Sequence, residues 1–317
     1  MIVVTGGLGF IGSNLVRALN RQGREDLLIV DSDADNKKTN NISGCHVRDI
    51  VGINEFRELL GSDSCPKDIE LIFHQGACAD TTEGDEAYML DNNYQYSLDL
   101  LHYCENNKTR FIYASSAAVY GNSTNFDESP ENEKPINIYA KSKLLLDNYA
   151  RTRFGAAQIQ IVGLRYFNVY GRGEVHKGHM ASVGYHFNKQ LRETGVMKLF
   201  EGTDGYNDGG QERDFIHVDD IISINLWFMK HPDVSGIYNV GTGNPRTFND
   251  VASSVESWHK HGEIEYIDFP QKLRGKYQSY TKADLQLLRK AGCKHEFTSL
   301  ESGMTNYLNW LNSDLTG

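Results

Sequence analysis

The sequence has 317 residues, a length that predicts one large domain or two domains of moderate size. Hydrophobic residues make up 39% and charged residues 23%, which is ordinary for a globular protein. The formal net charge of −10 argues against a nucleic-acid-binding protein, because such proteins normally present a basic face. It still allows a small anionic ligand held by a few local cations.

The cysteines and the apolar runs bear on the compartment. The five cysteines are odd in number and form no C-x-x-C pair, which disfavours a disulfide framework and favours a reduced, cytoplasmic location. No apolar stretch approaches the roughly 18 residues of a membrane span, so we expect no membrane partner. We also expect no signal peptide, a fold that begins at residue 2, and no metal site.

Short apolar runs alternate with helical patterns, which is typical of a parallel sheet with helical crossovers. The first half of the chain contains predicted strands at 1–5, 27–30, 70–74, 110–114 and 158–164, and predicted helices at 12–22, 91–106 and 139–154. The second half contains predicted helices at 180–193, 219–230, 248–260, 282–291 and 300–311, with an apolar stretch at 198–200 and a strand at 236–240. The predicted fold class is α/β, a doubly wound parallel sheet of the Rossmann type with a smaller, mainly helical C-terminal domain.

A glycine-rich segment, Thr5–Gly12, lies between the first predicted strand and the first predicted helix. Its glycines fit two spacings, Gly7-x-Gly9-x-x-Gly12 and Gly6-x-x-Gly9-x-x-Gly12. Glycine allows a tight turn and lets the backbone approach a pyrophosphate, while the helix N-terminus supplies unpaired N–H groups. A glycine-rich turn without a ligand is the alternative. The flanking strand and helix, with an acidic residue at the end of the next strand, favour dinucleotide binding.

Asp31 is that acidic residue, and it ends the strand beside which the adenosine ribose would lie. A carboxylate at this position usually favours NAD. Lys37 and Lys38 follow within one loop, where they could pair with the 2′-phosphate of NADP or remain solvated loop charges. The residues alone therefore leave NAD and NADP open. We predict a dinucleotide-binding domain over 1–168 and a substrate-binding domain over 169–317, with 213–243 returning to the first.

Three residues beyond the glycine segment form a candidate catalytic group. Ser116 follows the predicted strand 110–114, at the sheet edge where doubly wound folds bind ligands. Tyr139 and Lys143 are four residues apart and share one face of a predicted helix. A free tyrosine has a pKa of about 10, and a nearby ammonium together with a nicotinium charge would lower it toward neutrality. Ser116 could donate to the same substrate oxygen. Each residue alone could be structural, but all three in this order favour catalysis.

These motifs resemble those of the extended short-chain dehydrogenases/reductases, with further matches at Arg213–Asp220 and Tyr238–Gly243. Finer segments are similar to the ADP-L-glycero-D-manno-heptose 6-epimerases, a family of nucleotide-sugar epimerases: 74–78, 81–83, 89–97, 165–171, 176–183, 199–202, 269–270 and 273–278. The resemblance runs from residue 2 to about residue 310. It implies a homo-oligomer, a pentamer in that family, which supplies heptose for lipopolysaccharide in a Gram-negative cytoplasm.

The resemblance also implies a reaction, the redox-neutral epimerisation of ADP-heptose at one side-chain carbon. Tightly held NADP takes a hydride from the sugar, a ketone forms, and the hydride returns to the opposite face. Acid/base groups are then needed on two sides of the carbon, and the resemblance assigns these roles to Tyr139 and Lys177. Lys143 would hold the nicotinamide ribose and lower the pKa of Tyr139. Without the resemblance, Lys177 lies in a polar loop, and a lysine accepts a proton only where burial or nearby cations lower its pKa.

Binding residues follow from the resemblance by position. The cofactor set is Gly6, Gly9, Phe10, Ile11, Gly12, Asp31, Ser32, Lys38, Gln75, Gly76, Ala77, Cys78, Ala79, Asn92, Tyr139, Lys143, Val169 and Lys177. The substrate set is Ser116, Asn168, His179, His186, Phe200, Glu201, Gly202, Thr203, Arg213 and Tyr277. The fork of Arg213 suits a diphosphate, and Phe200 could cover a base or a sugar ring. Without the resemblance, His186 could equally face solvent and Phe200 could belong to a core.

The sequence departs from the family at several positions. Ser32 stands where the family often has Asn, Gln75 where it often has Glu, and His179 where a serine is usual. The loop 203–212 looks longer than the usual form. Ile53 occupies a position where a lysine often helps to bind the 2′-phosphate, which leaves Lys38 as the main support for NADP.

Three other functions compete with this interpretation. A UDP-hexose 4-epimerase would share the triad, but the Lys177 loop and Asp91–Ser97 argue against it. A 4,6-dehydratase would carry an Asp-Glu pair where Ala117 and Ala118 stand. A dinucleotide-sensing protein on the same fold would usually have lost the tyrosine or the lysine, and both are present.

Overall fold

The computed structural model describes residues 1–32, 36–62, 64–271 and 277–313. Its centre is a seven-stranded parallel sheet, counted over these residues, with the strand order β11-β6-β5-β4-β1-β2-β3. The strands are β1 (Ile2–Thr5), β2 (Leu27–Asp31), β3 (Asp49–Gly52), β4 (Leu71–His74), β5 (Arg110–Ser116), β6 (Ile161–Tyr166) and β11 (Gly236–Val240). The predicted α/β class with a doubly wound sheet is confirmed.

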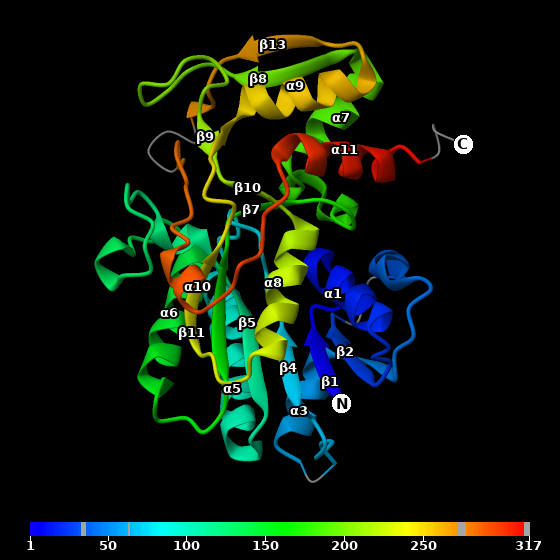
Figure 1. Cartoon of the computed structure of the whole chain (residues 1–317), viewed down its shortest axis with the longest axis vertical. Helices are drawn as coiled ribbons and strands as arrows, with labels where there is room; N and C mark the ends of the chain where they lie inside the picture. Colours follow the sequence, from blue (N-terminus) through cyan, green and yellow to red (C-terminus); the bar gives the residue numbers. More distant parts are fainter. Residues whose placement is uncertain (33–35, 63, 272–276, 314–317) are drawn as a thin grey trace.

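Helices cover both faces of this sheet (Figure 1). They are α1 (Phe10–Arg21), α3 (Ile53–Leu60), α5 (Tyr96–Asn107), α6 (Ile138–Arg153), α8 (Val218–Lys230) and α10 (Gln286–Lys290), while the short helix α4 (Glu86–Leu90) packs against α6. Alternate residues of β1 serve the two faces. Ile2 packs in one core with Leu15 of α1, and Val3 packs in the other with Leu101 of α5. Because a parallel sheet is buried on both sides, its strands read as continuous apolar runs.

Short segments connect these elements and carry much of the site. They are α2 (Asn36–Thr39), the 3₁₀ turns η1 (Asn40–Ile42), η3 (Ala117–Tyr120), η4 (Pro130–Asn132) and η5 (Val175–Met180), and the π-helical turn η2 (Asp91–Gln95). The turn η2 continues directly from α4 into α5, and such π turns are frequent at functional sites.

A smaller layer lies above the carboxyl ends of the central strands (Figure 1). Its helices are α7 (Val183–Thr194), α9 (Phe248–His259) and α11 (Leu300–Leu311). Its strands pair two by two: β7 (Asn168–Tyr170) with β10 (Phe215–His217), β9 (Glu212–Arg213) with β12 (Arg246–Thr247), and β8 (Val196–Phe200) with β13 (Glu263–Ile267). Its own core includes Phe187, Val251 and Met304. Among the described helices, none combines the length and the apolar character needed to cross a bilayer.

The sequence analysis located most of these elements and missed others. The predicted helix at 282–291 is wrong for its first half, because only Gln286–Lys290 is helical. The preceding stretch is extended, since Thr281 N–H donates to the Glu212 carbonyl and Ala283 N–H to Asp214 Oδ2. Strands β3 and β13 were not predicted. β3 is only four residues long with two apolar side chains, and β13 alternates glutamates with apolar residues, so neither forms a buried apolar run.

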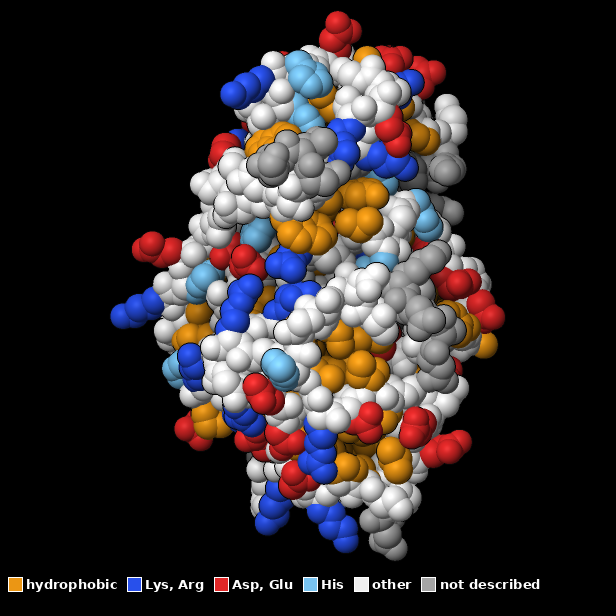
Figure 2. All heavy atoms as spheres, turned by 90° about the vertical axis from the view of Figure 1, so that its right-hand side faces the viewer, with side chains coloured by type: hydrophobic (Ala, Val, Ile, Leu, Met, Phe, Trp, Pro, Cys, Tyr) orange, Lys and Arg blue, Asp and Glu red, His pale blue; other side chains and the backbone are white. Residues whose placement is uncertain are grey.

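Charge is unevenly distributed over the surface. On the face drawn in Figure 2, lysine and arginine side chains gather across the middle of the molecule while acidic side chains lie around them. A hollow of about 410 Å³ between α1, α8 and α11 is lined by Arg17, Arg21 and Arg172. Arg17 is bound to the loop carbonyls of Asn41 and Ser43. This arginine-lined hollow is therefore partly structural, because Arg17 anchors the loop that follows β2.

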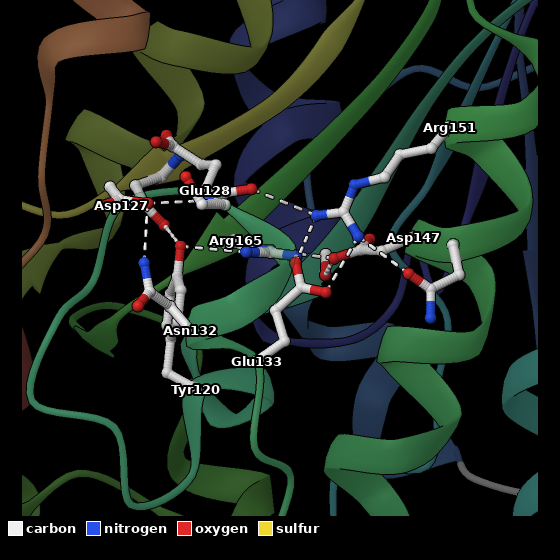
Figure 3. A network of polar contacts seen from close by, with 12 residues as sticks. Tyr120, Asp127, Glu128, Asn132, Glu133, Asp147, Arg151 and Arg165 are labelled. Carbon is white, nitrogen blue, oxygen red and sulfur yellow. Dashed lines mark hydrogen bonds and ion pairs between the residues drawn. The ribbon is translucent and has the colours of Figure 1, made fainter.

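A buried ion network lies behind the end of β5 (Figure 3). The Arg165 side chain on β6 is fully buried, and its guanidinium donates to Asp147 Oδ2 at 2.9 Å and to Glu133. Asp147 on α6 also accepts hydrogen bonds from the hydroxyls of Tyr113 and Ser115, each at 2.9 Å. Because buried charges are tolerated only when they are paired and hydrogen-bonded, these contacts set how α6 lies against β5 and β6.

Glu128 lies buried beside this network, and Asn239 N–H donates to its Oε1 at 2.8 Å. Burial raises the pKa of Glu128 to about 7, although the Asn239 bond and the Arg165 charge act in the opposite direction. The folded pKa therefore lies above the ordinary value of 4.5. It follows that this group stabilises the fold fully below pH about 4.5, and that the contribution is lost as the pH rises through about 7.

We predict that Glu128→Gln removes part of the pH dependence of stability. The amide oxygen can accept the Asn239 hydrogen bond but cannot ionise. The free energy of unfolding of the variant, relative to the wild type, should rise by about 2 kcal/mol between pH 5 and pH 8. Urea titrations at both pH values measure this difference, with the exposed Glu131→Gln as control. An unchanged difference between the two pH values would contradict the prediction.

Candidate active site

The glycine-rich segment forms a tight turn from β1 into α1. A Cβ on Gly12 would lie 2.1 Å from the Gly6 carbonyl oxygen, and one on Gly6 would lie 2.6 Å from the Gly76 nitrogen. Both positions therefore exclude any larger residue. No side chain caps α1 among the described residues, so its first N–H groups remain open to an anion.

A cavity of about 370 Å³ opens beside this turn. Most of the predicted cofactor set lines it: Gly6, Gly9, Phe10, Ile11, Gly12, Asp31, Ser32, Lys38, Gln75, Gly76, Ala77, Cys78, Ala79, Asn92 and Lys177. Tyr139, Lys143 and Val169 are not among the described residues that line the cavity. Val169 packs instead against the core between the sheet, α1 and α8.

Asp31 closes one end of the cavity at the tip of β2. Its Oδ2 accepts a hydrogen bond from Leu8 N–H at 2.9 Å and its Oδ1 one from Ser32 N–H at 2.8 Å. The Lys38 amine lies 3.5 Å from Oδ1 of the same carboxylate and 3.3 Å from the Ser32 hydroxyl. A carboxylate and a lysine therefore meet at the place where a ribose 2′ position would lie. The Lys37 side chain lies outside the described part of the structure.

A buried hydrogen-bond chain organises the floor of the cavity. Gly76 N–H donates to Thr5 Oγ1 at 3.1 Å, and the Thr5 hydroxyl lies 2.6 Å from His74 Nδ1. Because the Ser97 hydroxyl donates to the Asn93 carbonyl at 2.6 Å, it accepts from His74 Nε2 at 2.8 Å, which leaves His74 Nδ1 to accept from Thr5. Burial, with a smaller contribution from the Lys143 charge, lowers the pKa of His74 to about 3. This histidine is thus neutral, and the chain has one fixed direction.

The Asn93 side chain, which projects from η2, extends this chain to helix α6. It accepts a hydrogen bond from Cys78 N–H at 2.8 Å and donates to the Cys78 carbonyl at 2.9 Å. It also donates to Ser142 Oγ at 3.2 Å, and Ser142 donates to the Tyr139 carbonyl at 2.7 Å. One buried amide therefore links the loop at 75–79 to the first turn of α6.

The candidate catalytic group lies where β5 meets α6. Lys143 is buried, and its amine donates to the Ala114 carbonyl at 2.8 Å. Burial lowers the pKa of Lys143 to about 8, while the carboxylate of Asp147 one turn further along α6 acts to raise it. Burial raises the pKa of Tyr139, and a hydrogen bond with Ser116 lowers it in part. The structure therefore brings Ser116, Tyr139 and Lys143 together, as the helical spacing predicts.

Lys177 comes from a different part of the chain, the turn η5. Its Nζ lies 5.4 Å from the centre of the Phe10 ring at the start of α1. Burial lowers the pKa of Lys177, and the Glu174 carboxylate acts in the opposite direction. Lys177 lines the same cavity as Cys78. A depressed pKa is what a lysine needs in order to exchange a proton near neutral pH.

The predicted substrate residues separate into two groups. Arg213 is buried, with its guanidinium 4.6 Å from the centre of the Tyr277 ring, and burial lowers its pKa. Among the ion pairs of the described residues, none involves this guanidinium, which donates to the Glu212 carbonyl at 3.0 Å. Phe269 joins the rings of Tyr277 and Phe200 through edge contacts. The chain thus presents a desolvated cation beside a row of aromatic rings that meet edge to face.

The remaining predicted substrate residues are more exposed. His179 Nε2 lies 3.8 Å from Asp80 Oδ2, and the His186 ring lies 3.3 Å from the His179 carbonyl. Asn168 Oδ1 accepts a hydrogen bond from the Thr281 hydroxyl at 3.4 Å. Glu201, Gly202 and Thr203 begin the loop that follows β8. Residues 273–276 of the predicted motif lie outside the described residues.

A sequence profile described as the NAD dependent epimerase/dehydratase family matches residues 2–241. The chain belongs to this family. An ADP-L-glycero-D-manno-heptose-6-epimerase of Alkalilimnicola ehrlichii is 53% identical over 97% of this chain and 96% of its own length. The solved ADP-L-glycero-D-manno-heptose-6-epimerase of Helicobacter pylori is 31% identical over 98% of this chain and 96% of its own, with a TM-score of 0.85. The UDP-glucose 4-epimerase of Thermus thermophilus, solved with NAD, is 25% identical over 98% of both chains, with a TM-score of 0.80. The resemblance read from the motifs is confirmed.

Several residues of this family member line the cavity without having been predicted, namely Thr5, Tyr88, Tyr96 and His176. Thr5 directly precedes the glycine turn, and His176 directly precedes Lys177. Both could therefore have been predicted from the site residues next to them in the sequence. Tyr88 and Tyr96 flank η2, and nothing in the local sequence shows that this segment bends toward the cavity. Ile53, noted only as a departure from the family, also lines it.

Proposed function

We propose that this chain epimerises ADP-glycero-manno-heptose at C6, from the D-glycero to the L-glycero configuration, with a retained nicotinamide dinucleotide. The 53% identity to the Alkalilimnicola ehrlichii 6-epimerase over almost the whole chain carries this proposal. The grouping of Ser116, Tyr139 and Lys143 near a dinucleotide-sized cavity that Lys177 also lines supports it. The product would supply heptose for lipopolysaccharide.

The residues around the cavity fit a nicotinamide dinucleotide. The turn that admits only glycine at Gly6 and Gly12 leaves room for a pyrophosphate against the open N-terminus of α1. Asp31 stands at the ribose end. A bound nicotinamide would supply the acceptor and then the donor of one hydride, so the net redox change would be zero. NADP is the preferred form in our proposal, because Lys38 lies where a 2′-phosphate could pair with it.

Tyr139 would exchange the proton of the C6 hydroxyl on one side of the sugar. In this mechanism the Lys143 ammonium and the nicotinium charge would oppose the effect of burial, which raises the pKa of Tyr139, because a nearby cation lowers the pKa of an acidic group. The carboxylate of Asp147 supports this by favouring the charged form of Lys143. Ser116 donates a hydrogen bond to the same substrate oxygen and so holds it in line with the phenolate.

Lys177 would exchange the proton on the opposite side after the sugar turns. Burial lowers the pKa of this amine, which favours proton exchange by a group that must both take and return a proton. Arg213 would bind the diphosphate, because a buried guanidinium that has no carboxylate partner among the described residues is stabilised by an anion. The adjoining rings of Phe200 and Tyr277 would cover the rest of the nucleotide sugar.

The location and the assembly remain predictions. Each of the five cysteines is a free thiol, which agrees with a reduced cytoplasm. A homo-oligomer, a pentamer in this family, is expected from the resemblance.

The test of the proposed function is direct observation of the epimerisation. We expect purified protein without added cofactor to convert ADP-D-glycero-D-manno-heptose into the L-glycero isomer, because the cofactor is retained and recycled. Proton NMR distinguishes the two isomers. Absence of conversion, even with added NADP and then NAD, would contradict the proposal, and turnover of UDP-hexoses would identify a 4-epimerase instead.

Tyr139→Phe and Lys177→Met should each lower kcat by at least about 100-fold while the cofactor stays bound, because each removes one partner of a two-sided proton transfer. Turnover by the NMR assay and cofactor content after denaturation provide the measurements. Tyr149→Phe and Lys141→Met are matched controls on the same helix, α6, and should retain activity. Wild-type turnover by the Lys177 variant would refute the two-base assignment.

Lys38→Ala should weaken NADP binding by about tenfold more than NAD binding, because it removes a charge-assisted contact to the 2′-phosphate. Titration of both cofactors into cofactor-stripped protein measures the two affinities. Lys67→Ala, an exposed lysine, serves as the control. Equal losses for both cofactors would remove the basis for preferring NADP.

A further inference from the structure

Glu174 is an acidic residue that the proposed reaction does not use, although it is fully buried. It lies in the segment 171–182, which joins β7 to α7 and carries Lys177. Its Oε1 accepts hydrogen bonds from Gly171 N–H at 3.2 Å and from the Ser182 hydroxyl at 2.7 Å. Its Oε2 accepts one from Ser182 N–H at 2.5 Å. One carboxylate therefore binds both ends of the segment.

This carboxylate has no ion-pair partner among the described residues. A buried charge without a cation costs free energy unless hydrogen bonds compensate it. Its compensation comes from the Gly171 and Ser182 donors, and the Tyr307 hydroxyl of α11 lies close enough for the Glu174 charge to act on it. A neutral residue would avoid the cost of burial, so the position of this charge calls for an explanation.

The segment held by Glu174 leads directly to Lys177. Lys177 N–H donates to the Glu174 carbonyl at 2.9 Å, which closes the turn that carries the lysine. Ser182, the other partner of the carboxylate, caps the N-terminus of α7. The Asn14 amide holds the start of the segment on α1, since it donates both to the Arg172 carbonyl at 2.7 Å and to the Phe10 carbonyl at 2.9 Å. The lysine is thus fixed relative to the glycine turn.

We infer that Glu174 is a positioning residue for Lys177: its buried carboxylate ties the two ends of the segment 171–182 and so holds the lysine amine at the cavity. This inference rests on the proposed role of Lys177. It gives a function to Glu174, which does not line the cavity and is not among the predicted cofactor-binding or substrate-binding residues.

The charge of Glu174 also acts on the amine that it positions. It is the described group that opposes the effect of burial on the pKa of Lys177. The other described titratable groups around the cavity are Asp31, Lys38, Cys78, Tyr88, Tyr96 and His176, and none of them changes in the variants below. Loss of the Glu174 charge should lower the Lys177 pKa further, which moves its limb of the pH–rate profile to lower pH whether Lys177 acts as acid or base.

The experiment compares Glu174→Gln, which removes the charge, with Glu174→Asp, which keeps the charge but retracts it. The glutamine variant should have a kcat about 10- to 100-fold below the wild type, since small displacements of an acid/base group are costly. The limb of its pH–rate profile that reports Lys177 should move by about one pH unit to lower pH. The aspartate variant should lower kcat without moving either limb. Both should retain cofactor. Glu193→Gln, an exposed change on α7, is the matched control.

The outcomes separate the inference from the proposed function. The role of Glu174 would be overturned if the glutamine variant kept the wild-type kcat and the wild-type pH–rate profile. If Lys177→Met were inactive in the same assay, the two-base mechanism would remain intact. An active Lys177→Met would instead refute the mechanism. Loss of activity together with loss of cofactor and no shift of either limb would reduce Glu174 to a structural residue. If the glutamine variant fails to fold, wild-type kcat in the aspartate variant would overturn the inference.

Discussion

The buried ion pair between Arg165 and Asp147 is the contact on which the geometry of the site depends (Figure 3). It joins β6 to α6, and Asp147 is bound to β5 through Tyr113 and Ser115. Tyr139, Lys143 and Asp147 follow one another at intervals of four along α6, so fixing Asp147 fixes the other two. Burial of such a pair gains little net stability, and removal of one partner is costly because the other charge is left unpaired. The pair is better understood as a determinant of register than as a source of stability.

A second set of contacts places the cofactor cavity relative to that helix. The chain from Gly76 through Thr5, His74 and Ser97 to Asn93 crosses from the first strand to the fourth and then to η2. Its members are neutral and buried, so each donor has one acceptor and the chain carries no charge that a ligand must offset. The charged groups that line the cavity, Asp31, Lys38 and Lys177, lie outside this chain. The neutral chain therefore shapes the cavity without contributing charge to it.

The sequence predicted those parts of the site whose chemistry is local. The glycine turn, Asp31 and the Tyr139–Lys143 pair each lie within a few residues of the signals that indicate them, and their spacing follows from helix and strand periods. Lys177 needed the family, because a lysine in a polar loop has no periodic signal. Glu174, Asn93 and Arg165 were not predicted as organising residues, since their partners are distant in sequence or are backbone groups. The helix expected at 282–291 failed for a related reason: pairing with Glu212 and Asp214 holds its first half extended.

The strand order has a consequence for how the chain is made. The first strand lies inside the sheet, with β2 and β3 added outward on one side and β4, β5, β6 and β11 on the other. Each new strand can therefore pair with one that the ribosome has already released. Two edges stay uncovered for long stretches of synthesis: the edge of β1 until β4 is made, and the edge of β6 while everything from β7 through α8 is synthesised before β11. An uncovered, apolar edge strand is a template for association with other chains, so nascent molecules are exposed to aggregation during these two intervals.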